Sequence, residues 1–167
     1  HHDETPIRLI GVFDTVGEFG VPEFNGLRMA DRDELRFLKF ADRDLSKRVE
    51  NGRQALAIDE RRADFMPTLW TEREGIRQVW FAGAHADIGG GYEERGLSDI
   101  ALQWMVDEVN ALDAGLQLSP ERLERPLAPD PLQDRHDETH HLSWRTRPHE
   151  EREIDDDATL HPSVLQR

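Results

Sequence analysis

The chain has 167 residues with 21 Lys+Arg and 35 Asp+Glu, so its formal net charge is −14 at pH 7. This acidic balance argues against nucleic acid and anionic lipid surfaces as electrostatic partners, because binding to either needs clustered Lys and Arg. The chain contains no Cys, which excludes disulfides, thiolate metal sites and a cysteine nucleophile. The length suits one domain or a piece of a larger one.

Two short apolar runs predict buried strands. The first covers residues 7–13 (Ile-Arg-Leu-Ile-Gly-Val-Phe) and the second covers residues 76–82 (Ile-Arg-Gln-Val-Trp-Phe-Ala). Their β-branched and aromatic residues and their Gly-rich flanks favour strands over buried helix segments. A long connection separates the two runs, as parallel pairing requires, so we predict adjacent parallel strands.

The connection between these strands has a helical pattern. Leu45, Val49 and Leu56 stand at i, i+4 and i+11, which places them on one face of a helix. The spacing therefore predicts a helical crossover. The three consecutive charged residues Asp59, Glu60 and Arg61 are expected to form a buried ion-pair network that ties down the next loop.

A second helix is predicted over residues 99–113. Ser98 is a favourable N-cap residue, and Gly115 stands where a left-handed C-cap is expected. Trp104 lies on the apolar stripe of this helix with Ile100, so we predict that Trp104 belongs to the core.

The order strand, helical connection, strand, helix predicts an α/β fold with a parallel sheet. We expect residues 1–119 to form this core and residues 120–167 to form a loop-rich acidic tail, with one strand around residues 141–146. Two strands alone do not make a stable sheet. The missing sheet partners would come from the rest of a longer domain or from another molecule.

Ionisable residues follow both predicted strands, where α/β proteins place functional groups. Asp14 follows the first strand, and His85 and Asp87 follow the second. After Ile88 come three glycines, Gly89, Gly90 and Gly91, whose turn leaves room for close backbone approach. A purely structural interpretation is also open: Asp14 would cap a turn, and His85 and Asp87 would form a structural pair.

Two chemistries fit these residues. An Asp can orient a neutral His that acts as general base for a Ser nucleophile. Alternatively, His85, Asp87 and Asp14 could bind a metal for hydrolysis. His161, near the end of the chain, is a lone His in a predicted loop.

Five blocks of sequence resemble a known family. They cover residues 11–17 (Gly-Val-Phe-Asp-Thr-Val-Gly), 55–61 with 65–67, 79–92, 97–105 and 161–164. Their order is similar to that in the family of uncharacterised α/β-hydrolase domains that includes the type VI secretion phospholipase effectors. The stretch 79–92, Val-Trp-Phe-Ala-Gly-Ala-His-Ala-Asp-Ile-Gly-Gly-Gly-Tyr, is the most specific.

The resemblance implies an α/β-hydrolase fold and a Ser-Asp-His triad that acts on lipid or other ester bonds, with no cofactor. The chain order in that fold is nucleophile, acid, His. We therefore expect Asp87 as the acid and His161 as the base. Asp14 is the competing acid, one strand earlier, and His85 is the competing base. The Gly89–Gly91 turn would shape the floor of the site.

One departure from the family is important. Its nucleophile lies in a Gly-x-Ser-x-Gly motif, which this chain lacks. We therefore expect residues 1–167 to be the C-terminal part of one catalytic domain, with the Ser supplied from outside this chain. Alternatives are a non-catalytic binding or scaffold fragment and the metal-dependent hydrolase described above.

The resemblance also implies partners and a location. The expected partners are an ester or phospholipid substrate, the remainder of the catalytic domain, and an immunity or secretion-tip protein, with no nucleic acid. The expected location is the bacterial cytoplasm or, after type VI secretion, the periplasm of a target cell.

Overall fold

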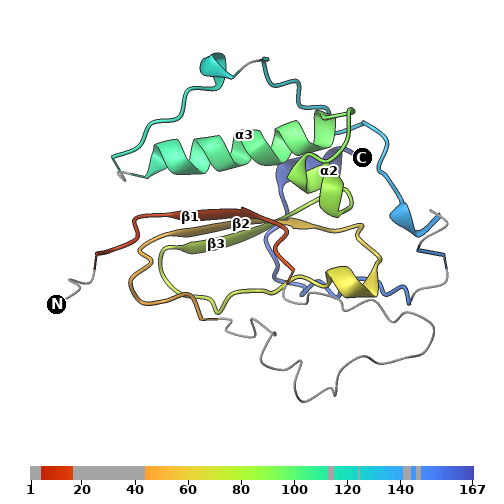
Figure 1. Cartoon of the computed structure of the whole chain (residues 1–167), viewed down its shortest axis with the longest axis horizontal. Coiled ribbons are helices and arrows are strands. Elements are labelled where there is room, and N and C mark those ends of the chain that lie inside the picture. Colours follow the sequence, from red (N-terminus) through yellow and green to blue (C-terminus); the bar gives the residue numbers. More distant parts are fainter. Residues whose placement is uncertain (1–4, 17–43, 113–114, 124, 141–143, 146–147) are drawn as a thin grey trace.

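A computed structural model describes residues 5–16, 44–112, 115–123, 125–140, 144–145 and 148–167. Three strands, β1 (Ile10–Phe13), β2 (Gly52–Ala57) and β3 (Ile76–Phe81), form one parallel sheet in the order β1-β2-β3. A long helix lies over one face of this sheet (Figure 1). The predicted class, a partial α/β fold with parallel strands, is confirmed.

The predicted pairing of the two apolar runs is only half right. They are parallel strands of one sheet, but they are not adjacent, because β2 lies between them. Leu56 therefore belongs to a strand, and the helical crossover predicted through it is wrong. The reason is that all six residues of β2 are buried, including Arg53 and Gln54, so the strand shows no alternation of apolar and polar residues.

Two helices follow β3, α2 (His85–Gly89) and α3 (Gly96–Ala111). The helix predicted over residues 99–113 is present but begins three residues earlier. Arg95 is the N-cap, and Ser98 lies in the first turn, where its hydroxyl donates to the Arg95 carbonyl at 3.1 Å. The N-cap prediction for Ser98 is therefore wrong. Gly115 has a left-handed φ of +71°, but α3 already ends at Ala111, with Leu112 as its C-cap.

The core lies between α3 and the sheet. Trp104 is 9 % exposed and packs edge-to-face on Phe81 of β3, with ring centroids 5.5 Å apart, so its predicted core position is confirmed. Gly11 of β1 lies against Met105, where an added Cβ would stand 2.8 Å from the Met sulfur. Residues of β2 complete the core, so that all three strands pack against one face of α3. The other buried members of this core are Ala55, Ala57, Val79, Ile88, Leu97, Ile100 and Ala101.

The described residues between positions 120 and 167 form loops and short 3₁₀ turns. The turns are η2 (Pro120–Arg122), η3 (Glu138–His140) and η4 (Pro162–Gln166); an earlier one, η1 (Ala63–Phe65), follows β2. The strand expected around residues 141–146 lies mostly outside the described residues.

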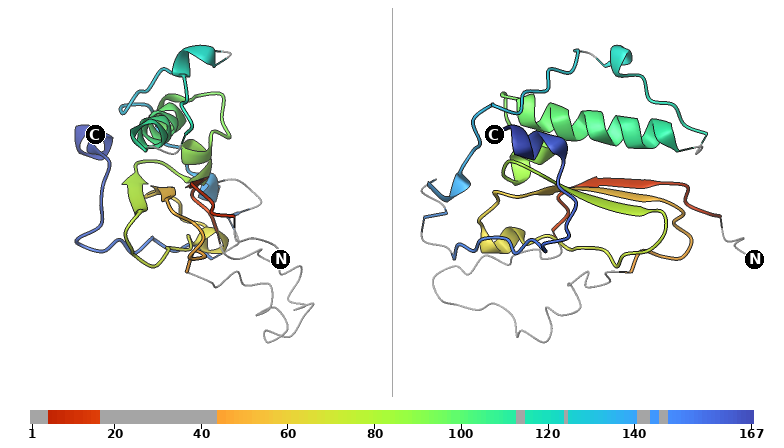
Figure 2. Two further views of the ribbon diagram at one scale, coloured as in Figure 1. Left: turned by 90° about the vertical axis from the view of Figure 1, so that its left-hand side faces the viewer. Right: turned by 180° about the vertical axis from the view of Figure 1, so that it is seen from behind.

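The end of the tail covers the outer edge of β3 (Figure 2). The Trp80 amide donates to the Thr159 carbonyl at 2.9 Å, and the His161 amide donates to the Trp80 carbonyl at 2.8 Å. The tail is therefore attached to the sheet. Among the described residues, no helix is long and apolar enough to cross a membrane.

Candidate active site

Asp14 and His85 form a hydrogen-bonded pair at the carboxyl edge of the sheet. Asp14 directly follows β1, and His85 is the first residue of α2, four residues after the end of β3. Their atoms Oδ2 and Nδ1 lie 2.7 Å apart, although 71 residues separate the two positions in sequence. This arrangement is that of an acid that orients a histidine base.

Asp14 is held in place from several sides. Its side chain is fully buried. Oδ1 accepts the amide of Ala57 at 2.8 Å, and Arg152 donates to Oδ1 at 2.6 Å and to Oδ2 at 2.9 Å. Asp14 also has a left-handed φ of 48°, a conformation that Asp tolerates better than most residues. Such backbone outliers concentrate at functional sites.

These donors keep Asp14 ionised. Burial by itself raises the pKa of the carboxyl, but hydrogen bonds from His85 and Arg152, the charge of Arg152 and the Ala57 amide outweigh it, so the pKa lies below its ordinary value. An ionised carboxylate only accepts hydrogen bonds. Nδ1 of His85 is therefore the donor in this contact, and Nε2 is an acceptor whenever the ring carries a single proton.

The second ring nitrogen of His85, Nε2, is not used by the contact with Asp14. The side chain is 29 % exposed, and no hydrogen bond from the described part of the chain reaches Nε2. The edge of the Phe65 ring packs on the imidazole with centroids 5.0 Å apart. Within the described residues, the His85 ring is thus held through Nδ1, while Nε2, the atom through which a base would receive a proton, has no hydrogen-bond partner.

A buried ion pair supports the backbone beneath His85. Glu60 accepts the His85 amide at 3.2 Å and pairs with Arg62 at 2.7 Å. The sequence predicted a buried network among Asp59, Glu60 and Arg61. Glu60 is indeed buried, but its partner is Arg62, and Arg61 is half-exposed. The sequence of neighbouring charged residues does not show whether Arg61 or Arg62 is the buried partner of Glu60.

The protein is expected to lose stability in acid. Burial raises the pKa of Glu60, but the Arg62 contacts and the His85 amide outweigh it, so Glu60, like Asp14, has a lowered pKa in the folded state. Such groups stabilise the fold above their unfolded pKa and lose this contribution as the pH falls through the folded pKa. Urea unfolding should therefore show a falling free energy of unfolding below about pH 4.5, the ordinary Glu value.

The Glu60→Gln variant should show a weaker loss between pH 7 and pH 3 than the wild type. Glu153→Gln, which removes an exposed carboxylate, is the matched control and should keep the wild-type pH dependence. Equal pH dependence in all three proteins would contradict the assignment to Glu60.

Asp87, the acid expected from the sequence, belongs to a second pair. Its Oδ1 lies 2.7 Å from Nδ1 of His136, and its Oδ2 accepts the amides of Ala84 at 2.9 Å and His136 at 3.1 Å. The His136 ring stacks on Tyr92 with centroids 3.6 Å apart. Asp87 thus caps the start of α2 and anchors the loop that carries His136, a residue that no motif of the sequence singles out.

His161, the base expected from the sequence, is not brought to Asp87. Its Nδ1 lies 2.9 Å from the Ser163 hydroxyl and accepts the Ser163 amide at 3.3 Å, which caps η4. The ring stacks on Phe81 with centroids 4.6 Å apart, and burial lowers the pKa of His161. The nitrogen that a triad acid would hold is therefore occupied by a local cap.

The three glycines end α2. Gly90 has a φ of +82° and its amide donates to the Ala86 carbonyl at 2.9 Å, the left-handed cap expected of a glycine. Gly89 and Gly90 also line a pocket of about 340 Å³ with Phe13, Ile88 and residues of α3. Gly91 lies close to Ala86. The role of these glycines as the floor of the site stays a prediction.

The metal-site alternative finds no support in the donor arrangement. Within the described residues, no three His, Asp or Glu side chains converge as metal ligands would. Asp14 already accepts four hydrogen bonds, and Asp87 is occupied by His136 and two amides.

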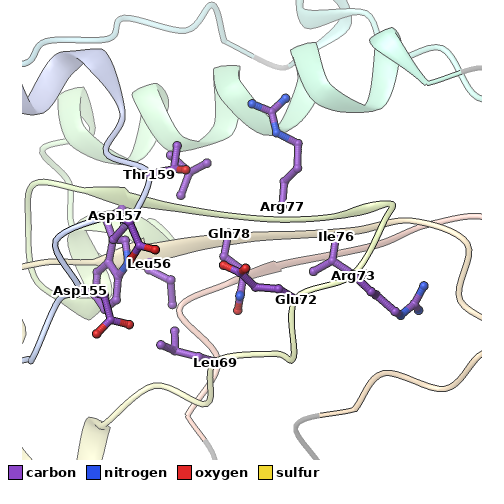
Figure 3. Close-up of a pocket in the computed structure, with 13 residues that line it drawn as sticks. Leu56, Leu69, Glu72, Arg73, Ile76, Arg77, Gln78, Asp155, Asp157 and Thr159 are labelled. Carbon is purple, nitrogen blue, oxygen red and sulfur yellow. The ribbon is translucent and has the colours of Figure 1, made fainter.

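A pocket of about 480 Å³ is lined by neither Asp14 nor His85; Figure 3 shows its lining residues. Leu56, Leu69 and Gln78 line it on the sheet face opposite α3, and Asp155 and Asp157 of the tail close one side. It contains no histidine. We assign the candidate chemistry to the carboxyl edge of the sheet and not to this pocket.

Comparison with known proteins identifies one family. The model described as "T6SS, phospholipase effector Tle1-like, catalytic domain" matches residues 1–108, which include β1 to β3, Asp14, His85 and most of α3. His136, Arg152 and His161 lie beyond the matched region. No curated protein and no solved structure gives a significant match.

Proposed function

Because the chain belongs to the family of T6SS Tle1-like phospholipase effector catalytic domains, we propose that it supplies the acid and the base of a serine phospholipase. In this proposal Asp14 is the acid, His85 is the base, and a Ser from outside this chain is the nucleophile. The observation that carries the assignment is the 2.7 Å contact between Asp14 Oδ2 and His85 Nδ1.

The chemistry follows from the state of the pair. Nε2 of His85 accepts the proton of the Ser hydroxyl as its oxygen attacks the ester carbonyl of the lipid, and Asp14 stabilises the resulting imidazolium. The imidazolium then gives this proton to the leaving alcohol. Water hydrolyses the acyl-enzyme by the same proton transfers, which regenerates the Ser.

Geometry favours this pair over the one first expected. Asp14 and His85 are in contact, whereas Asp87 contacts His136 and His161 contacts Ser163. The order acid then His is kept, since Asp14 precedes His85 along the chain. Both residues also lie in the region that the family model matches.

A serine-directed fluorophosphonate probe tests the proposal. The 167-residue chain should not be labelled and should not cleave a short-chain activated ester, because none of its serines lies in a Gly-x-Ser-x-Gly motif. The longer protein that contains the upstream nucleophile should be labelled at that Ser, and His85→Ala should strongly slow the labelling.

The matched control is His161→Ala, which removes a histidine of the same chain that contacts neither Asp14 nor His85. It should label at the wild-type rate. Labelling of the short chain above background would show that the nucleophile is one of its own serines. Unchanged labelling of the His85→Ala protein would reject His85 as the base.

A further inference from the structure

Arg152 makes the most extensive contact with the proposed acid, yet it lies far along the chain. Its two terminal nitrogens donate to the two oxygens of Asp14 at 2.6 and 2.9 Å, a bidentate arrangement that fixes the carboxylate plane. The same nitrogens donate to the carbonyls of Ala57 at 2.5 Å and Phe65 at 2.6 Å. The side chain is 1 % exposed.

The backbone around Arg152 is anchored to the same edge of the core. His149 forms an antiparallel bridge with Arg62, and the Glu150 amide donates to the Arg61 carbonyl at 2.9 Å. The guanidinium therefore enters the site from a segment that is held by the loop after β2. This segment belongs to the tail, outside the residues that the family model matches.

The contacts determine how Asp14 can act. Each of its oxygens accepts two hydrogen bonds, so rotation of the carboxylate would break several of them. Without Arg152, Asp14 would keep its burial but lose its positive neighbour, which favours the neutral acid. A neutral acid can donate a proton to Nδ1 and leave His85 in the tautomer that cannot act as base through Nε2.

Fold stability alone is a weak reason for such a residue. Replacing a buried ion pair by apolar residues is often neutral or stabilising. The Nε–H of Arg152 is buried and has no hydrogen-bond partner among the described residues, which adds a cost. The hydrogen bonds that offset the cost of burying Arg152 go to the Asp14 carboxylate and to the carbonyls of Ala57 and Phe65.

Building on the proposed function, we propose that Arg152 is a positioning residue that holds the Asp14 carboxylate ionised and aimed at His85. The C-terminal tail then completes the active site, although the family match ends before it. Arg152 touches neither substrate nor nucleophile in this role and acts only through Asp14.

The other charged groups near Asp14 and His85 have ionic partners of their own. Glu60, on the loop after β2, contacts the His85 amide and is paired with Arg62. Asp87, on α2 itself, is paired with His136 of the tail. Within the described residues, Arg152 is thus the arginine that contacts Asp14 directly. Its replacement by a neutral residue removes the positive charge that favours the ionised form of Asp14.

The test compares Arg152→Gln, Arg152→Lys and Arg61→Gln in the longer protein that contains the nucleophile. Arg152→Gln should lower kcat/KM at pH 7 by about 100-fold, the size expected when a reacting group loses its alignment. The acidic limb of its pH–rate profile should also move to higher pH, because removal of a positive charge eases protonation of the pair.

Arg152→Lys keeps the charge but not the two-pronged contact. It should lower kcat and leave the acidic limb near the wild-type position. Arg61→Gln, which removes a half-exposed arginine of the same region, should behave as wild type. A wild-type pH profile and wild-type kcat/KM in Arg152→Gln would overturn the proposal, as would wild-type kcat in Arg152→Lys.

A second measurement does not depend on activity. In the 167-residue chain, the ¹³C resonance of the Asp14 carboxyl should titrate at higher pH in Arg152→Gln than in the wild type. If it does, while His85→Ala leaves the longer protein fully active, the positioning holds and the proposed function fails. If the Arg152→Gln variant no longer unfolds cooperatively, the kcat of the Arg152→Lys variant becomes the deciding measurement, and a wild-type kcat there rejects the positioning role. An unmoved Asp14 titration in folded Arg152→Gln protein rejects the positioning role.

Discussion

In the longer protein, His85→Ala is expected to lower kcat by about 10³–10⁶-fold, the range found when a member of a catalytic unit is removed. Asp14→Asn should cause a loss of similar order, because an amide no longer stabilises the imidazolium and permits the wrong tautomer. The double variant should be little worse than either single one, since the two residues act as a unit. Steady-state kinetics on a phospholipid ester measures all three.

The two variants differ in their effect on the fold. Asp14→Asn leaves Arg152 buried without its ionic partner, and breaking a buried ion pair costs about 3–5 kcal/mol. Circular dichroism and thermal unfolding must therefore accompany the kinetics of that variant. His85→Ala keeps the contact between Asp14 and Arg152, so it is the cleaner test of catalysis.

Two further variants serve as controls in the same assay. Asp87→Asn and His161→Ala alter the pair first expected from the sequence, and both should retain most of kcat. If His161→Ala abolishes activity while His85→Ala does not, the base is His161. If Asp87→Asn abolishes activity while Asp14→Asn is nearly silent, the acid belongs to the later strand.

Trp104→Ala is expected to destabilise the protein by about 3–5 kcal/mol, the usual cost of truncating a buried aromatic residue to Ala. The indole fills the space between α3 and β3 and contacts the Phe81 ring. Because protein interiors are close-packed, truncating the indole leaves a cavity that the surroundings fill only in part. Denaturant titration of the 167-residue chain gives the free energy of unfolding.

Asp107→Ala is the matched control, because Asp107 is an exposed residue of the same helix. Its effect should stay within about 0.5 kcal/mol, as for most surface substitutions. A loss below about 1 kcal/mol for Trp104→Ala would show that the helix does not depend on this contact, since core truncations of this kind cost several times more.

Local sequence patterns predicted two kinds of element: short runs rich in β-branched and aromatic residues, and a helix with one apolar face. The runs at residues 7–13 and 76–82 contain β1 and β3, and the apolar stripe around Trp104 belongs to α3. The sequence pattern did not reveal β2 because this strand is buried on both faces and contains the polar residues Arg53 and Gln54, whose side chains hydrogen-bond to groups far away in sequence. Arg53, for example, donates to Glu108 of α3 at 2.6 Å, a partner that no local window includes.

By itself, the sequence determined the α/β class, the family resemblance and a short set of candidate residues that included Asp14 and His85. Only the tertiary structure paired Asp14 with His85 and Asp87 with His136, and only it brought in Arg152, 138 positions after Asp14. The physical reason is that periodicity reports which side of an element faces the core. Which side chains meet depends instead on how the carboxyl ends of the strands and the tail converge at one edge of the sheet.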